Sequence, residues 1–177
     1  MLTVLQALCE KLESIGIEYM LSGSLALNLY TVPRMTRDID VIIHFTDENI
    51  EPFISGFDSE YFVDDIGIRQ EIKRRGIFNL IHKSTALRID CIVMKNGAYR
   101  LVEFGRRVRN EEYGFPIWVV TKEDLILSKL LWIQDLQSDK QMEDIRHLLA
   151  SGSIEYKYLN EWKENLRLNT YNLFDHE

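Results

Sequence analysis

The sequence has few cysteines and prolines and no long hydrophobic run. Its 177 residues include two cysteines and three prolines. Cys9 and Cys91 stand in apolar surroundings without metal-ligand spacing, which predicts reduced, buried thiols and a cytoplasmic location. No apolar stretch reaches the roughly 18 residues of a membrane span, and the N-terminus lacks the pattern of a signal peptide. These absences argue against a disulfide framework, a cysteine-ligated metal and a membrane-spanning segment.

Positive charge is outnumbered by negative charge. The chain has 21 Lys and Arg residues against 28 Asp and Glu residues, a net charge of −7. This balance argues against a general nucleic-acid-binding surface, although it is compatible with a local basic patch around one acceptor. Internal repeats, linkers and low-complexity segments are absent from the sequence. We expect a core over residues 1–120 and a C-terminal helical segment over 121–177 that packs on it as one compact unit.

The most informative segment covers residues 21–45, LSGSLALNLYTVPRMTRDIDVIIHF. It ends in a predicted strand that begins with two carboxylates, Asp38 and Asp40. Side chains alternate along a strand, so these two point to the same face, about 6.5–7 Å apart. The other face carries apolar residues: Ile39, Val41, Ile43 and Phe45. Two carboxylates beside a buried strand repel each other and resist desolvation, so they require a cation such as Mg²⁺.

The small-residue turn before this strand indicates a place for phosphate. Gly23 allows the backbone to approach a ligand closely, and a helix that begins at Ser24 directs free N–H groups at an anion. Mg²⁺ keeps several waters and takes further ligands from substrate phosphates. Metal ligands and a phosphate cradle on neighbouring elements imply nucleotide chemistry.

A third carboxylate lies about fifty residues later. Residues 77–82 and 86–94 have the pattern of a hairpin, and in the second arm Arg88 and Asp90 share one face while apolar residues occupy the other. The alternative is that Asp38, Asp40 and Asp90 are ordinary solvated carboxylates at strand ends. A D-x-D pair alone is weak evidence for a metal site, but its combination with the upstream turn and the later strand Asp favours one.

The remaining periodicities predict further elements. Strands are expected at 17–21, 61–63 and 115–120, whereas 99–109 fits a helix and a strand equally well. Thr121 has the position of a helix cap, with Asp124 three residues further on. Helices are expected at 3–15, 24–31, about 48–55, 65–73, 125–136, 139–150 and 155–166.

The order of these motifs resembles the nucleotidyltransferase fold of the DNA polymerase β superfamily. The matching features are the G-S turn, the T-R-D-I-D-V strand and the later strand Asp. More narrowly, the chain is similar to the small bacterial nucleotidyltransferases of the AbiEii toxin type. The resemblance implies an α+β fold in which a mixed sheet is flanked by helices, with further helices at the C-terminus.

The resemblance also implies roles for individual residues. In that superfamily the Gly-Ser pair contacts the nucleotide phosphates, the D-x-D pair holds two Mg²⁺ ions, and the third Asp helps to hold the catalytic metal beside the attacking hydroxyl. These roles fall on Gly23, Ser24, Asp38, Asp40 and Asp90. Downstream, V-T-K-E-D-L-I-L-S-K-L and E-D-I-R look like the Lys and Asp motifs of the toxin group.

Three further residues have two interpretations each. Lys129 interrupts an apolar helix, and it either extends its ammonium into water or contacts the triphosphate. Asp144 is either an exposed helical carboxylate without a special role or the counterpart of the toxin-group Asp. Arg34 follows Val32-Pro33 where relatives often have a glycine, which leaves its direction open between solvent and phosphate.

The sequence therefore predicts a metal-dependent nucleotidyltransferase. It would transfer a nucleoside monophosphate from an NTP to a hydroxyl of a protein, an RNA end or a small molecule such as an antibiotic, with release of pyrophosphate. The alternative is a partner protein of the same fold, paired with a cognate toxin or antitoxin, in which transfer is weak or lost. Fold alone does not decide between the two.

Overall fold

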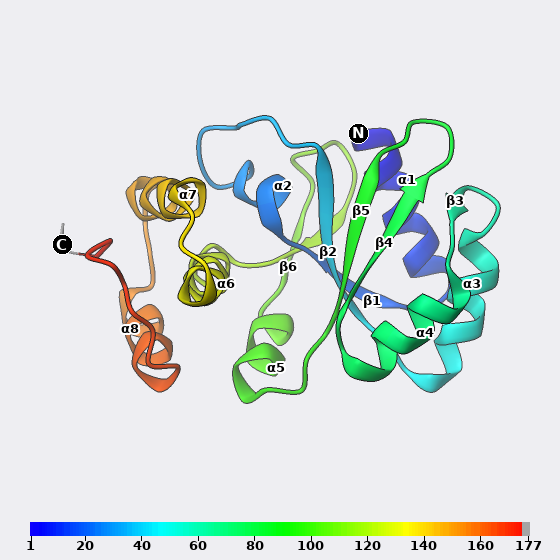
Figure 1. Ribbon diagram of the computed structural model, residues 1–177. Coiled ribbons are helices and arrows are strands. Elements are labelled where there is room, and N and C mark those ends of the chain that lie inside the picture. Colours follow the sequence, from blue (N-terminus) through cyan, green and yellow to red (C-terminus); the bar gives the residue numbers. More distant parts are fainter. Residues whose placement is uncertain (175–177) are drawn as a thin grey trace.

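The computed structural model describes residues 1–174, and its centre is a seven-stranded mixed sheet (Figure 1). The strand order is β3-β4-β5-β2-β1-β7-β6. The strands are β1 (Glu18–Leu21), β2 (Asp38–His44), β3 (Tyr61–Phe62), β4 (Ile77–His82), β5 (Arg88–Val93), β6 (Val108–Asn110) and β7 (Ile117–Val119). The predicted mixed sheet with flanking helices is confirmed.

The helices cover both faces of the sheet. The helices are α1 (Leu2–Ser14), α2 (Gly23–Leu27), α3 (Ile50–Phe57), α4 (Asp65–Arg74), α5 (Ala98–Gly105), α6 (Lys122–Asp135), α7 (Asp139–Ala150) and α8 (Tyr156–Asn165), with a 3-10 turn at Asp47–Asn49. Helices α1, α3 and α4 lie along one face, α2, α5 and α6 lie on the other, and α7 and α8 continue outward from α6 (Figure 1). No helix within residues 1–174 is long and apolar enough to cross a membrane.

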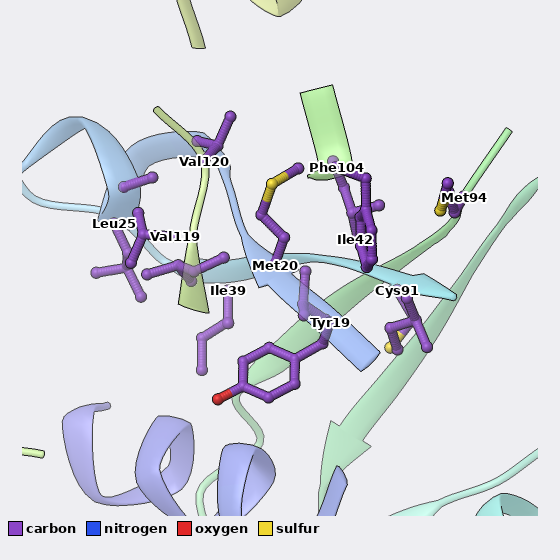
Figure 2. Packing of buried hydrophobic residues seen from close by; sticks show 14 of the residues in the cluster. Tyr19, Met20, Leu25, Ile39, Ile42, Cys91, Met94, Phe104, Val119 and Val120 are labelled. Carbon is purple, nitrogen blue, oxygen red and sulfur yellow. The ribbon is translucent and has the colours of Figure 1, made fainter. Parts of the chain in front are cut away.

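Strand β2 lies in the middle of the sheet, and its two faces differ in chemistry. It pairs antiparallel with β1 and parallel with β5. Ile39, Val41 and Ile43 are at most 1% exposed. Tyr19 and Ile39 point toward α1, whereas Ile42 lies on the opposite face beside Phe104 of α5 (Figure 2). The alternation predicted from the sequence thus places Asp38 and Asp40 on the face that α2, α5 and α6 border.

Helix α2 is shorter than the predicted helix over 24–31. It ends at Leu27, and the following residues form tighter turns, with bonds from Leu29 N–H to the Ala26 carbonyl and from Tyr30 N–H to the Leu27 carbonyl. The side chain of Asn28 bonds to both backbone groups of Arg34, each at 2.9 Å. Asparagine side chains that bond to nearby backbone compete with helix formation, which accounts for the early stop.

The structure settles the conformation of residues 99–109 and shortens the strand expected at 115–120. Residues 99–109 contain both candidate structures, because α5 ends at Gly105 and the short edge strand β6 follows. The strand expected at 115–120 is limited to β7, and the Val120 N–H bonds to the carbonyl of Leu21 just beyond the paired residues. Cys9 and Cys91 are buried free thiols, as their apolar surroundings predicted.

The C-terminal helices are anchored to one another through a buried carboxylate at the start of α6. The Thr121 hydroxyl accepts a bond from the Asp124 N–H, which confirms the predicted cap. The Asp124 carboxylate is fully buried and receives the hydroxyls of Thr121 and Tyr158, each at 2.6 Å, as well as the Arg106 guanidinium at 3.1 Å. Several donors thus compensate the burial of this charge and join α6 to α8.

Candidate active site

The three predicted carboxylates meet on one face of the sheet. The parallel register of β2 and β5 places Asp40 directly beside Asp90. Two residues earlier on both strands, the same register places Asp38 beside Arg88. On the far side of β5, Asn79 of β4 is paired with Asp90. Residues that are separated by fifty positions in the sequence therefore form a continuous polar row across three strands.

Burial and neighbouring charges perturb the carboxyl group of Asp40. Burial, followed by repulsion from Asp38 and Asp90, raises the pKa of Asp40 to about 6. A backbone hydrogen bond from Ser24 and the charge of Lys129 act in the opposite direction without cancelling the rise. A carboxyl group in this state gains from a nearby cation, because a cation favours its charged form.

The close approach of α2 to Asp40 requires glycine at position 23. Gly23 has φ +59°, and a Cβ built on it would lie 1.8 Å from Asp40 Oδ2. The sequence predicted that Gly23 leaves room for a phosphate. The space beside its Cα holds the Asp40 carboxyl, so the glycine positions a carboxylate against the start of α2, and its contact with phosphate stays a prediction.

Lys129 and Asp144 form a buried ion pair. The side chains of Lys129 and Asp144 are 6% and 2% exposed, and Lys129 Nζ lies 2.7 Å from Asp144 Oδ2 and 2.7 Å from Gln141 Oε1. One of the two interpretations of each residue is therefore excluded: the Lys129 ammonium does not extend into water, and Asp144 is not an exposed helical carboxylate. Burial lowers the pKa of Lys129 despite its bond to Asp144.

Arg34 connects this ion pair to the Ser24 turn. Its Nε and one terminal nitrogen bond to the two oxygens of Asp144 at 2.9 and 2.7 Å, and the same terminal nitrogen donates to Ser24 Oγ at 2.9 Å. Burial acts to raise the pKa of Asp144, but the hydrogen bonds from Arg34 and Lys129 outweigh it, so the pKa falls.

This network orients the Ser24 hydroxyl. Its oxygen accepts from Arg34, and among residues 1–174 no acceptor takes its proton. Ser24 is thus able to donate a hydrogen bond to an anion, with the Arg34 guanidinium at its side. The direction of Arg34, which the sequence left open, is fixed by Asp144.

A cavity of about 470 Å³ begins at the Ser24 turn and continues along the same face of the sheet. Asp40 and Lys129 border it at the turn. Its walls are mainly apolar and include Trp132 of α6, which is 59% exposed. The apolar and aromatic residues that line it include Ile42, Ile77, Ile92, Phe104 and Trp132. A pocket of this size and character is typical of sites for small organic ligands.

Several contacts of the site were not found from the sequence. Arg88 bridges Asp38 and Asp90, and Asn79 donates to Asp90 Oδ1 at 2.6 Å. The shared face of Arg88 and Asp90 was the available signal for the first contact. Gln141 on α7 carried no such signal, because a polar residue on a surface helix is ordinary.

The donor set suits an open magnesium site rather than a closed metal cage. Within residues 1–174, no group of three or more His, Cys, Asp or Glu side chains could by itself hold a metal ion. Mg²⁺ is usually bound through one or two carboxylates, with waters and substrate phosphates as the other ligands. Asp40, whose charge is opposed by burial and by two neighbouring carboxylates, has the chemistry of such a ligand.

Nearly the whole chain matches a protein family. Residues 2–175 match the family described as "Nucleotidyltransferase of unknown function (DUF6036)", so the protein belongs to this nucleotidyltransferase family. A comparison with curated protein sequences gives no match. The narrower resemblance to the AbiEii toxin type stays a prediction.

Solved structures of nucleotidyltransferases share the fold. The antigenic nucleotidyltransferase-like protein from Paracoccidioides brasiliensis is 20% identical with a TM-score of 0.57, over 93% of this chain and 86% of that one. ANT(2")-Ia in complex with adenylyl-2"-tobramycin is 14% identical with a TM-score of 0.57, over 94% and 96% of the two chains. The lincomycin-bound lincosamide antibiotic adenylyltransferase LnuA is 13% identical with a TM-score of 0.53, over 84% and 96%.

Proposed function

We propose that the protein transfers a nucleoside monophosphate from an NTP to a hydroxyl group, with Mg²⁺ and with release of pyrophosphate. The observation that carries this proposal is the meeting of Asp38, Asp40 and Asp90 on one sheet face beside the Ser24 turn. Repelling carboxylates on one sheet face do not stabilise a fold, whereas they suit a site that binds divalent cations.

Asp38 and Asp40 would hold two Mg²⁺ ions, and Asp90 would share the one next to the acceptor. Bound Mg²⁺ would neutralise the charge that develops on the attacking and leaving oxygens. Asp90 would also orient the acceptor hydroxyl. A bond forms between the acceptor oxygen and the α-phosphorus, the bond from that phosphorus to the β-phosphate oxygen breaks, and the hydroxyl proton passes to Asp90 or water.

The opposite side of the site would bind the leaving pyrophosphate. The Ser24 hydroxyl would donate to a phosphate oxygen, and the cationic groups of Arg34 and Lys129 would attract the triphosphate. Asp144 would act as a positioning residue, since it bonds to both cations and touches no substrate. Preorganised donors of this kind lower a barrier without reorganisation during the reaction.

The cavity would hold the nucleoside. It begins at the proposed phosphate-binding residue Ser24 and extends along the apolar residues Ile42 and Phe104 to Trp132. A base is a flat aromatic group, and the exposed indole of Trp132 in the cavity wall offers it a stacking surface. Neither Asp38 nor Asp90 borders this cavity, so the acceptor would approach Asp90 from the open side of the row.

The structural neighbours suggest which molecule carries the acceptor hydroxyl. One structural neighbour is by its name a lincosamide antibiotic adenylyltransferase, and another is in complex with adenylyl-2"-tobramycin, which makes a small hydroxylated molecule the first candidate. A protein hydroxyl and an RNA end are the others. A partner-binding member of a toxin–antitoxin pair, located in the cytoplasm, is the alternative function, and transfer activity would then be weak or absent.

The test uses NTPs labelled at either the α- or the γ-phosphate, together with Mg²⁺ and cell lysate. The proposal expects acceptors to gain label from the α-labelled NTP alone, and EDTA or the Asp40→Asn substitution to abolish the gain. Arg37→Gln, which changes an exposed residue near the site, serves as the control. Transfer of the γ-label, or equal labelling by the Asp40→Asn protein, would contradict the proposal.

A further inference from the structure

The Arg88 guanidinium lies between two of the proposed metal ligands. One of its terminal nitrogens is 2.9 Å from Asp38 Oδ2 and 3.1 Å from Asp90 Oδ2. Its Nε is 2.9 Å from Asp90 Oδ1. Arg88 therefore makes a two-point contact with Asp90 and a single contact with Asp38, and it links neighbouring parallel strands.

The contacts of Arg88 complete the hydrogen bonding of these carboxylates. Asp38 Oδ1 accepts from the Thr36 hydroxyl at 2.8 Å, and Asp90 Oδ1 also accepts from Asn79 at 2.6 Å. All four oxygens of Asp38 and Asp90 thus have a donor. Asp40, in contrast, has no ion pair with any residue that the structure describes.

We propose that Arg88 competes with divalent cations for Asp38 and Asp90, and so sets the cation concentration that the site requires. This inference rests on the proposed function. A cation that takes an oxygen from each carboxylate must displace the guanidinium, because the same oxygens bind it. The displacement is feasible because the Arg88 side chain is 53% exposed and has solvent on its open side.

The magnitude follows from the exposure of these contacts. The Asp38 and Asp90 side chains are 30% and 19% exposed, so the two ion pairs are only partly shielded from water. Two exposed ion pairs of ordinary strength would weaken cation binding about two- to thirtyfold. Removal of Arg88 also leaves three carboxylates to repel one another, which should destabilise the protein when cations are absent.

A purely structural ion pair predicts a different outcome. If Arg88 merely holds β2 and β5 together, its removal disorders the carboxylates, and cation binding becomes weaker or stays the same. If Arg88 competes, its removal makes cation binding tighter even though the protein is less stable in EDTA. Cation affinity and stability therefore change in opposite directions only under the proposal.

The test measures Mn²⁺ binding by the EPR signal of the free ion, with Mn²⁺ alone and with α,β-methylene-ATP. Arg88→Gln should bind Mn²⁺ about two- to thirtyfold more tightly than the wild type. Arg37→Gln, which removes an exposed arginine near the site, should match the wild type. Arg88→Lys keeps the charge but loses the two-point contact, so its Mn²⁺ affinity should lie between those of Arg88→Gln and the wild type. It replaces Arg88→Gln as the test variant if that protein does not fold.

Thermal melting gives a second readout. Arg88→Gln should melt at a lower temperature than the wild type in EDTA and gain more from added Mn²⁺. Unchanged or weaker Mn²⁺ binding by both Arg88 variants would overturn the proposal while leaving the nucleotidyltransferase function intact. If the wild type itself binds no Mn²⁺ even with the nucleotide analogue, the metal site of the proposed function fails together with this inference.

Discussion

A single added methyl group at Gly23 should displace Asp40 and stop transfer. A Cβ at this position would lie 1.8 Å from Asp40 Oδ2 and 2.4 Å from Asp40 Cγ, whereas ordinary contact begins at 3.4 Å. To reach ordinary contact, the carboxyl must therefore move by 1.6 Å, the difference between 3.4 and 1.8 Å. A misplacement of about 1 Å at a reacting centre costs on the order of a hundredfold in rate.

Gly16 provides a matched control for the backbone contribution. Its φ of +70° is close to that of Gly23, but a Cβ there would have no atom within 4 Å. Gly16→Ala should thus cost only the strain of a left-handed alanine, about 1 to 2 kcal/mol of unfolding free energy. Gly23→Ala should cost that amount and, in addition, lose about a hundredfold or more in transfer.

Urea unfolding and the α-label assay measure the two effects separately. A second check places Gly23→Ala in an Asp40→Ala background, where the atoms nearest to the new Cβ are gone and only Asp40 Cβ, at 2.7 Å, remains. The stability cost of Gly23→Ala should be smaller there. Equal transfer by Gly23→Ala and Gly16→Ala would refute the reasoning, because it would mean that the Asp40 position is unimportant.

Three further substitutions test the roles assigned to the remaining residues. Asp90→Asn should nearly abolish transfer but change NTP affinity, measured by calorimetry, only a little, because Asp90 makes its contact mainly in the transition state. Wild-type turnover by this variant would remove Asp90 from the site. Ser24→Ala should weaken NTP binding by about 1–2 kcal/mol in the same measurement, and less than Gly23→Val does; the reverse order would contradict the assigned roles. Asp144→Asn leaves Lys129 buried without its partner, so it should cost about 3 kcal/mol in urea unfolding at pH 7. The pKa of Asp144 is lowered in the folded protein, so its ionised form stabilises the fold at pH values above its unfolded pKa of about 4, and this stabilisation is lost as the pH falls through the folded pKa. The difference in unfolding free energy between Asp144→Asn and the wild type should therefore shrink at low pH. A difference that stays constant would argue against an ionised Asp144.

Features that depend on local periodicity were predictable from the sequence. The alternation along residues 38–45 places Asp38 and Asp40 on one face, whatever the rest of the chain does. The cap at Thr121 is equally local. The placement of Asp90 beside Asp40 depends instead on a parallel register between β2 and β5, which no short pattern encodes. The sequence suggested it through the resemblance to a known superfamily.

The buried charges were not predictable in the same way. Asp144 lies on a helix of mostly polar residues, where a carboxylate is normally exposed. It is 2% exposed because two cations, from positions 34 and 129, satisfy it. Arg34 is separated from Asp144 by 110 positions, and its direction depends on the Asn28 turn that shortens α2. Burial of this kind is visible only after the fold brings the partners together.

The resulting charge distribution separates the two halves of the site. On the strand side, three carboxylates face one guanidinium, that of Arg88, so negative charge is in excess. On the helix side, the cations Arg34 and Lys129 share the single carboxylate of Asp144, so positive charge is in excess. Ser24 lies at the boundary, because the start of α2 approaches Asp40 closely and the Ser24 hydroxyl is bonded to Arg34. A ligand that is anionic on one side and accompanied by cations on the other satisfies both halves, and a triphosphate with its divalent metals has this character.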